Sequence, residues 1–139
     1  MNAIAWSESF ALQQPRMDRT HQEFVALLQR LAEAAEHGTD GLDALLAELA
    51  EHSVAHFNDE NERMAATAFP PAHCHLGEHE GVIGICKEVR GRVEAGEYEL
   101  GRVLARELDP WFRNHLATMD RMLAYWLNLD QAYRLWLQR

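Results

Sequence analysis

Hydrophobic residues along this chain recur every three or four positions, which is the period of an α-helix. Runs of Val, Ile and Thr bounded by turn residues, which mark β-strands, are absent from the sequence. The pattern therefore predicts an all-α protein. The first segment, roughly residues 1–16, contains Trp6, Phe10 and Pro15, and we expect it to be an N-terminal arm whose aromatic side chains pack across helix ends.

The next two segments predict long helices. The first covers roughly residues 17–36, with Asp18 near its positive N-terminal end and His37-Gly38 at its close. The second follows a cap at Thr39 or Asp40 and ends near the Phe69-Pro70-Pro71 stop.

Three more helical segments complete the chain. One carries apolar positions from Leu76 to Val93 and stops around Gly96. Its four internal glycines weaken it unless a neighbour packs closely against them; they are Gly77, Gly81, Gly84 and Gly91. The next spans roughly residues 99–127, with Pro110 as a kink or local break, and a short C-terminal helix covers roughly residues 130–138.

Four long helices with short connections favour an up-down-up-down four-helix bundle, here over roughly residues 17–127. The 139 residues are 47% hydrophobic and 25% charged, which is typical of one compact domain and excludes disorder. We therefore expect residues 1–139 to form a single domain.

The charge balance narrows the class of partner. Thirteen Lys and Arg against 22 Asp and Glu give a net charge of −9, which argues against nucleic acid, because phosphate binding needs a basic face. No hydrophobic run approaches the 18 residues of a membrane span. The two cysteines make no disulfide framework and the first ten residues lack a signal-peptide pattern, so we expect a cytoplasmic protein.

Five of the eight histidines, with two carboxylates, fall on the apolar stripes of the four predicted helices and are expected to face the core. These seven candidates are His21, His56, Glu60, His75, His79, His115 and Asp120. Two of the pairs, His56 with Glu60 and His75 with His79, have the i, i+4 spacing that lets two side chains of one helix reach one metal.

A lone inward histidine is usually a hydrogen-bonded core residue, but seven unpaired buried polar groups would cost about 7 to 20 kcal/mol together. That cost rivals the whole stability of a domain, about 5 to 15 kcal/mol. Water in a polar cavity would satisfy part of the set, whereas a metal cluster satisfies all of it and adds folding free energy. The sequence therefore predicts a metal centre.

The remaining candidates are weaker. His37 and His52 lie at a helix end or off the ligand face, so we expect both to be exposed. His73 competes with His75, but the residue four positions beyond His73 is Gly77, which cannot bind a metal. Cys74 is expected to be neither a metal ligand nor a redox group, and Cys86 to fill the core.

With these residues, the chain resembles the bacterial hemerythrins, the non-haem di-iron oxygen carriers. The resemblance runs from Trp6 to the last helix. It rests on MDRTHQ (17–22), HFNDE (56–60) with Met64, His75-x-x-x-His79, and WFRNHLATMD (111–120).

The resemblance implies two irons bridged by Glu60, Asp120 and an oxygen atom, one held by His75, His79 and His115 and the other by His21 and His56. Two octahedral ions offer about twelve positions, and these groups fill about eleven. Dioxygen then binds reversibly at the open position on the iron with two histidines. The resemblance also implies a dry pocket around that position, lined by Phe24, Phe57, Trp111, Phe112 and Leu116.

Two details of the pattern need local explanation. Asp120 follows His115 by five residues, which on a regular helix turns it about 140° away, so we predict a widened turn between them. The acidic residue that often follows the bridging glutamate in the family is Asn61 here. We expect Asn61 to affect the surface or the layer around the ligands rather than to bind a metal.

An oxygen-binding protein for storage, delivery or sensing is favoured over an enzyme. Five neutral imidazoles and two carboxylates leave a more positive cluster than the carboxylate-rich ferritin-like sites, which disfavours high oxidation states. The alternatives are a di-iron peroxidase or a scavenger of nitric oxide or oxygen, a sensor with a separate protein partner, and the same site filled with zinc or manganese.

Two features of the sequence bear on the oligomeric state in opposite directions. The acidic surface favours a monomer, which is what we expect, whereas the last helix carries apolar residues such as Tyr133, Leu135, Trp136 and Leu137. These residues either cover the bundle or form an interface, and we expect covering.

Overall fold

The computed structural model describes residues 4–38 and 40–139, and these residues contain helices and no strand. A 3₁₀ turn, Glu8–Phe10, precedes five helical segments and one π-helical turn. The helices are α1 Pro15–Glu36, α2 Leu42–Ala66, α3 Ala72–Glu94, α4 Glu99–His115 and α5 Arg121–Leu137, and the π-helical turn Leu116–Asp120 joins α4 to α5.

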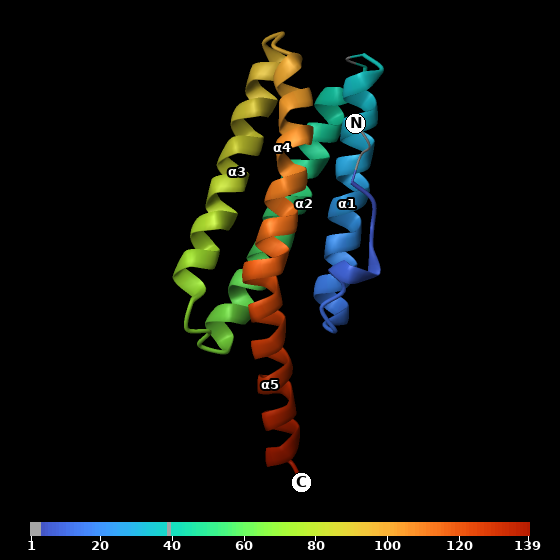
Figure 1. Ribbon diagram of the computed structural model, residues 1–139. Helices are drawn as coiled ribbons and strands as arrows, with labels where there is room; N and C mark the ends of the chain where they lie inside the picture. Colours follow the sequence, from blue (N-terminus) through green and yellow to red (C-terminus); the bar gives the residue numbers. More distant parts are fainter. Residues whose placement is uncertain (1–3, 39) are drawn as a thin grey trace.

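The helices form the predicted up-down-up-down bundle (Figure 1). Helix α1 packs against α2 and α4, and α3 packs against the same two helices. Each helix thus has two neighbours around a shared core, so any residue on an inward stripe faces the other three helices. The predicted fold class is confirmed.

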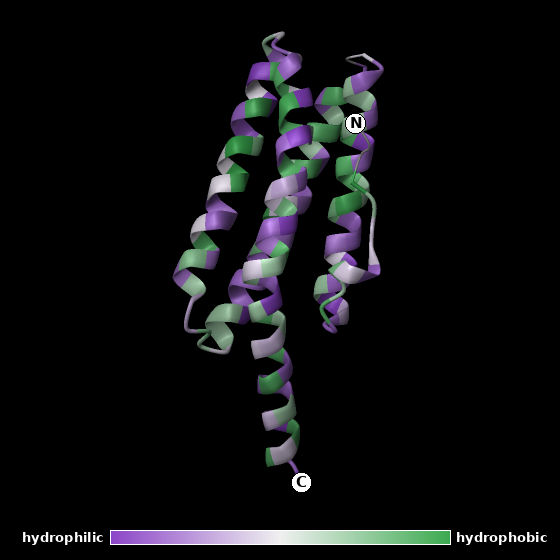
Figure 2. Cartoon of the chain, in the orientation of Figure 1, coloured by the Kyte–Doolittle hydropathy of each residue, from purple (hydrophilic) through white to green (hydrophobic). Residues whose placement is uncertain are grey.

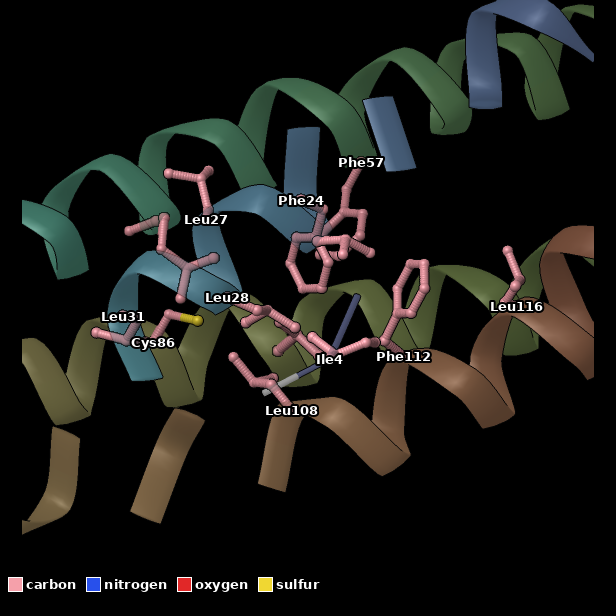
Figure 3. Packing of buried hydrophobic residues seen from close by; sticks show 14 of the residues in the cluster. Ile4, Phe24, Leu27, Leu28, Leu31, Phe57, Cys86, Leu108, Phe112 and Leu116 are labelled. Carbon is pink, nitrogen blue, oxygen red and sulfur yellow. The ribbon is translucent and has the colours of Figure 1, made fainter. Parts of the chain in front are cut away.

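The core is built from the predicted apolar stripes. Leu28, Leu31, Leu46 and Leu49 are almost completely buried, and Leu123 of α5 is fully buried with them. Figure 3 shows side chains of α1, α2, α3 and α4 meeting between the helices. Cys86 lies in this core as predicted, and burial raises the pKa of its thiol to about 11.

The glycines of α3 have a different role from the one predicted. A Cβ added at any of the four would meet no atom within 4 Å, so no neighbour packs closely against them; the four are Gly77, Gly81, Gly84 and Gly91. The close approach occurs instead at Gly101 of α4, where an added Cβ would lie 3.0 Å from Leu42 Cδ2. Gly101 therefore sets how closely α4 approaches the start of α2.

The N-terminal arm packs along the bundle before α1 begins at Pro15, a favoured residue in the first helical turn. The Phe10 ring meets Trp6 at 5.6 Å and Phe112 at 5.7 Å between centroids, both edge to face. Phe112 in turn lies 5.6 Å from the His21 ring, so the arm covers the middle of the bundle rather than the helix ends.

The C-terminal end differs from the sequence prediction. Pro110 does not break α4, because Pro110 and Arg106 are both exposed and the freed Arg106 carbonyl can be hydrated. No separate helix begins near residue 130, because no Gly or Pro interrupts residues 121–137 and α5 continues to Leu137.

Helix α5 extends beyond the other helices (Figure 1). The expectation that its apolar residues cover the bundle is wrong, because Tyr133, Leu135 and Trp136 are 57–61% exposed. Within the described residues, no helix has the length and apolar character needed to cross a membrane.

Candidate metal centre

The seven predicted ligand residues meet at one buried place between the four helices. Helix α1 supplies His21, α2 supplies His56 and Glu60, α3 supplies His75 and His79, α4 supplies His115, and the π-helical turn supplies Asp120. Every one of these residues is at most 6% exposed. Their ligand atoms form two groups, Glu60, His75, His79, His115 and Asp120, and His21, His56 and Glu60.

The carboxylate of Glu60 links the two groups of imidazoles. Its Oε1 lies 3.3 Å from Nε2 of both His75 and His79. Its Oε2 lies 2.6 Å from His56 Nε2 and 3.7 Å from His21 Nε2. One oxygen therefore faces the histidines of α3, and the other faces those of α1 and α2.

The two carboxylate oxygens of Asp120 also face different groups of histidines. Its Oδ1 lies 3.1 Å from Nε2 of both His75 and His115, and its Oδ2 lies 3.1 Å from His21 Nε2. The two carboxylates are therefore placed to bridge between a three-histidine group and a two-histidine group.

The π-helical turn Leu116–Asp120 confirms the predicted widening after His115. An α-helix has 3.6 residues per turn, so residues five apart point in different directions. A π-helical turn hydrogen-bonds residue i to residue i+5, which brings His115 and Asp120 to the same side. Asp120 is consequently 1% exposed and lies among the histidines.

The polar atoms of the centre are not satisfied by the protein. Buried atoms without a hydrogen-bond partner include Nε2 of His21, His75, His79 and His115, together with Glu60 Oε1 and Asp120 Oδ1. The four Nε2 atoms lie 3.1–3.7 Å from carboxylate oxygens of Glu60 and Asp120, but among the described residues none of them has a hydrogen-bond partner of suitable geometry. Such groups are costly when buried, and metal ions would satisfy all of them, so the residues fit a two-metal centre.

The charges of the centre stabilise one another strongly. Burial lowers the pKa of His21 and His75, but the close negative carboxylates of Asp120 and Glu60 outweigh it and raise these pKa values to about 10 and about 9. Burial lowers the pKa of His79 despite Glu60. Burial would raise the pKa of Glu60, yet the surrounding imidazoles hold it well below its usual value. A metal ion therefore competes with protons for the same nitrogen atoms.

A second layer of polar residues orients two of the imidazoles. His79 Nδ1 hydrogen-bonds Asn61 Oδ1 at 2.8 Å, in keeping with the role expected of Asn61 around the ligands. His115 Nδ1 hydrogen-bonds Glu78 Oε1 at 2.7 Å. Such bonds fix which ring nitrogen faces the metal. Sequence reasoning missed Glu78, because its neighbour is 37 residues away on another helix and no spacing rule marks the pair.

An apolar cavity adjoins the centre. It has a volume of about 10 Å³ and is lined by His21, Phe24, His56, Phe57, Trp111, Phe112, His115 and Asp120. This is close to the smallest space that holds one water molecule, roughly 10–15 Å³. Four of the five predicted pocket residues line it, whereas Leu116 is buried but does not.

Aromatic rings form the wall of this cavity. The Phe24 and Phe112 rings stack at 5.4 Å between centroids, and Phe57 stacks on His79 at 4.1 Å. Trp111 stacks on His115 at 4.6 Å. Figure 3 shows Phe24, Phe57 and Phe112 directed into the space between the helices. The rings both exclude water and hold the ligand imidazoles in place.

The other sequence candidates lie away from the centre, with one correction. His37 is exposed as predicted, and His73 and Cys74 are also exposed. His52 is half-buried rather than exposed, because its Nε2 hydrogen-bonds Glu23 Oε2 at 3.2 Å and its ring lies 5.9 Å from that of His56. A polar cleft of about 350 Å³ between α1 and α2 reaches both histidines from the surface.

Comparison with known proteins supports one family. Residues 14–127 match the model of the hemerythrin HHE cation binding domain. The chain is 44% identical over 128 residues to a bacteriohemerythrin of Ralstonia nicotianae, covering 91% of this chain and 90% of that protein. It is 31% identical to a bacteriohemerythrin of Aquifex aeolicus, covering 78% and 85% of the two chains.

Solved structures agree on the fold. The crystal structure of wild-type hemerythrin superposes with a TM-score of 0.84 at 23% identity, covering 91% of this chain and 98% of that one. The domain match spans the whole bundle and includes all seven residues of the metal centre. The chain therefore belongs to the hemerythrin family.

Proposed function

We propose that this chain binds dioxygen reversibly at a di-iron centre held by the seven clustered side chains. His75, His79 and His115 would hold one iron and His21 and His56 the other, with the carboxylates of Glu60 and Asp120 between the two groups. The observation that supports this assignment is that each carboxylate directs one oxygen toward each of the two groups of imidazoles.

The unequal number of histidines leaves room for a ligand on one side. Both His21 and His56 line the small apolar cavity, so a ligand position left free beside these two histidines would open into it. A di-iron centre at this place would supply the two electrons that reversible binding of dioxygen requires. The cavity of about 10 Å³ leaves no room for a large substrate, which favours a very small ligand.

The protein's own contribution is to keep this position dry and its ligands fixed. Phe24, Phe57 and Phe112 are 2–3% exposed and separate the cavity from solvent. Glu78 and Asn61 hold the protons on Nδ1 of His115 and His79, which leaves both Nε2 atoms free to bind metal. A dry, rigid site prevents water and protons from promoting irreversible oxidation.

We favour an oxygen-binding role in storage, delivery or sensing over an enzyme. Five neutral imidazoles and two carboxylates make a less anionic ligand set than that of the carboxylate-rich oxidases, and so support lower oxidation states. We further place the protein in a reducing cytoplasm, because Cys74 is exposed, Cys86 is buried and both are free.

An optical spectrum of the anaerobically reduced protein tests this proposal. With about two irons per chain, we expect a visible charge-transfer band to appear when oxygen is admitted and to vanish when it is removed. A Glu60→Gln variant should lose iron and the band, whereas a His37→Gln variant, changed at an exposed histidine, should keep both.

Other outcomes overturn the proposal in different ways. Direct and irreversible oxidation, with rapid consumption of peroxide or nitric oxide, would identify a redox enzyme or scavenger. Native protein that contains zinc or manganese instead of iron would remove oxygen binding altogether.

A further inference from the structure

Helix α5 presents a continuous apolar face on the side away from the bundle. At 100° per residue, its buried residues Leu123, Ala124 and Leu127 mark the side that faces the bundle. Every residue in an arc of about 100° on the other side is apolar. Members of this arc, called here the outer face, are Met122, Tyr125, Leu129, Ala132, Tyr133 and Trp136.

The outer face is open to solvent along its whole length. Met122 and Leu129 are 54% and 50% exposed, and Tyr125, Tyr133 and Trp136 are 58–68% exposed. Figure 2 shows hydrophobic residues continuing along α5 beyond the rest of the bundle. An exposed apolar patch of this extent on a small domain marks an interaction site.

The far end of α5 also lacks support from the other residues that the structure describes. Residues 131–139 are all exposed, so no other helix packs on the last two turns. Isolated helical turns are marginally stable in water, and a partner that covers their apolar side would stabilise them.

The spacing of the outer face is the one that a second helix requires. Met122, Tyr125, Leu129, Ala132 and Trp136 are separated by three, four, three and four residues, which is the a/d repeat of a coiled coil. No charged residue lies within the arc. A charged residue within the arc would face the same charge of the second copy and would oppose the association of identical chains.

The outer face is self-complementary in the antiparallel direction. With Leu129 on a two-fold axis, Met122 of one copy lies opposite Trp136 of the other, and Tyr125 lies opposite Tyr133. A two-fold interface uses the same patch on both copies, and methionine packs well against an aromatic ring. This register therefore pairs the flexible Met122 with the ring of Trp136, and the ring of Tyr125 with that of Tyr133.

The area of the outer face and the net charge of the chain both agree with the pairing of two copies. The half-exposed large side chains of the outer face leave roughly 500 Å² per copy, since a full aromatic side chain buries about 150–250 Å². With the flanking residues, this approaches the roughly 800 Å² per partner of a standard interface. Each copy carries a net charge of −9, and antiparallel pairing puts the two acidic bundles at opposite ends of the helix pair.

We propose that two copies of this chain associate through antiparallel pairing of their α5 outer faces, with Leu129 at the two-fold axis. The pairing covers the exposed apolar residues of the outer face. It uses no residue of the metal centre, so it is independent of iron and oxygen.

Sedimentation equilibrium of the full iron-loaded chain, from roughly 1 µM to 1 mM, tests the pairing. We expect a monomer–dimer equilibrium and no larger species. Leu129→Arg places two like charges on the axis and should raise the dissociation constant roughly tenfold or more. Gln138→Arg adds the same charge to the same helix outside the arc and should leave the constant within about twofold.

Cysteine crosslinking then tests the direction of pairing, in a Cys74→Ser background that removes the exposed native thiol. Leu129→Cys should form a disulfide between copies, because only residues near the axis meet their own counterparts. Trp136→Cys should not, since it faces Met122. Crosslinking of both variants would indicate a parallel pair and overturn the proposed arrangement.

Two further results would also overturn the proposal. One is a mass that stays monomeric across the concentration range. The other is a monomer that sediments with phosphatidylcholine vesicles, with or without phosphatidylserine, which would identify the outer face as a lipid-binding surface. Circular dichroism of each variant confirms that the bundle remains folded.

Discussion

The apolar wall beside the metal centre can be opened at one residue, Phe24. Its ring is 2% exposed, stacks on Phe112 at 5.4 Å and lies 6.5 Å from the His52 ring. Phe24 lines the inner cavity of about 10 Å³, and His52 lines the surface cleft of about 350 Å³. His56 borders both spaces, with Phe24 lining the inner one and His52 the outer one, so we expect the Phe24 ring to help separate solvent from the oxygen-binding side.

Phe24→Ala should connect the two spaces. Removing the ring leaves about 100 Å³, room for roughly three water molecules at about 30 Å³ each. A buried Phe→Ala substitution costs about 3–5 kcal/mol of unfolding free energy. With water beside the bound oxygen, we expect the oxygen-bound form to decay to the ferric form at least about ten times faster.

Leu27→Ala is the matched control. Leu27 lies on the same helix and is 7% exposed, but it does not line the cavity. Its removal should cost about 2–5 kcal/mol without speeding the decay. Stopped-flow spectroscopy of the oxygen-bound form measures the rate, and urea unfolding measures stability. Equal decay rates in the two variants would refute the argument that Phe24 keeps the site dry.

Three further predictions concern charge, ligand orientation and packing. In the metal-free protein, the raised pKa of His21, about 10, contributes stability that is fully present below about pH 6.5 and lost as the pH rises towards 10, so its melting temperature should fall over that window more than that of the loaded protein. Glu78→Gln removes the carboxylate from His115 Nδ1 and should weaken iron binding about 10- to 100-fold in a chelator competition assay, while circular dichroism stays unchanged. Gly101→Ala should lower the unfolding free energy by about 1–3 kcal/mol through overpacking, whereas Gly84→Ala, with open space around it, should raise it by up to about 1 kcal/mol; the same sign for both would contradict the packing described here.

Much of the metal centre was predictable because helical periodicity fixes the face on which a residue lies. His56 with Glu60 and His75 with His79 share faces through their i, i+4 spacing, and apolar neighbours showed that these faces point inward. The same periodicity also predicted an irregularity in the helix. Asp120 reaches the side of His115 only if the turn between them is widened, and the structure contains a π-helical turn there. These inferences depend on contacts within one helix, which sequence spacing determines.

Contacts between helices were decided by the tertiary structure. The pairing of Glu78 with His115, the partial burial of His52 and the close approach at Gly101 each depend on how two helices are rotated and offset relative to one another. The exposure of Trp136 also depends on packing between helices. An apolar stripe indicates that a helix face avoids water, but it does not indicate which surface covers that face. The sequence by itself therefore determined the helices and their inward residues, whereas packing between helices decided which partner each side chain meets.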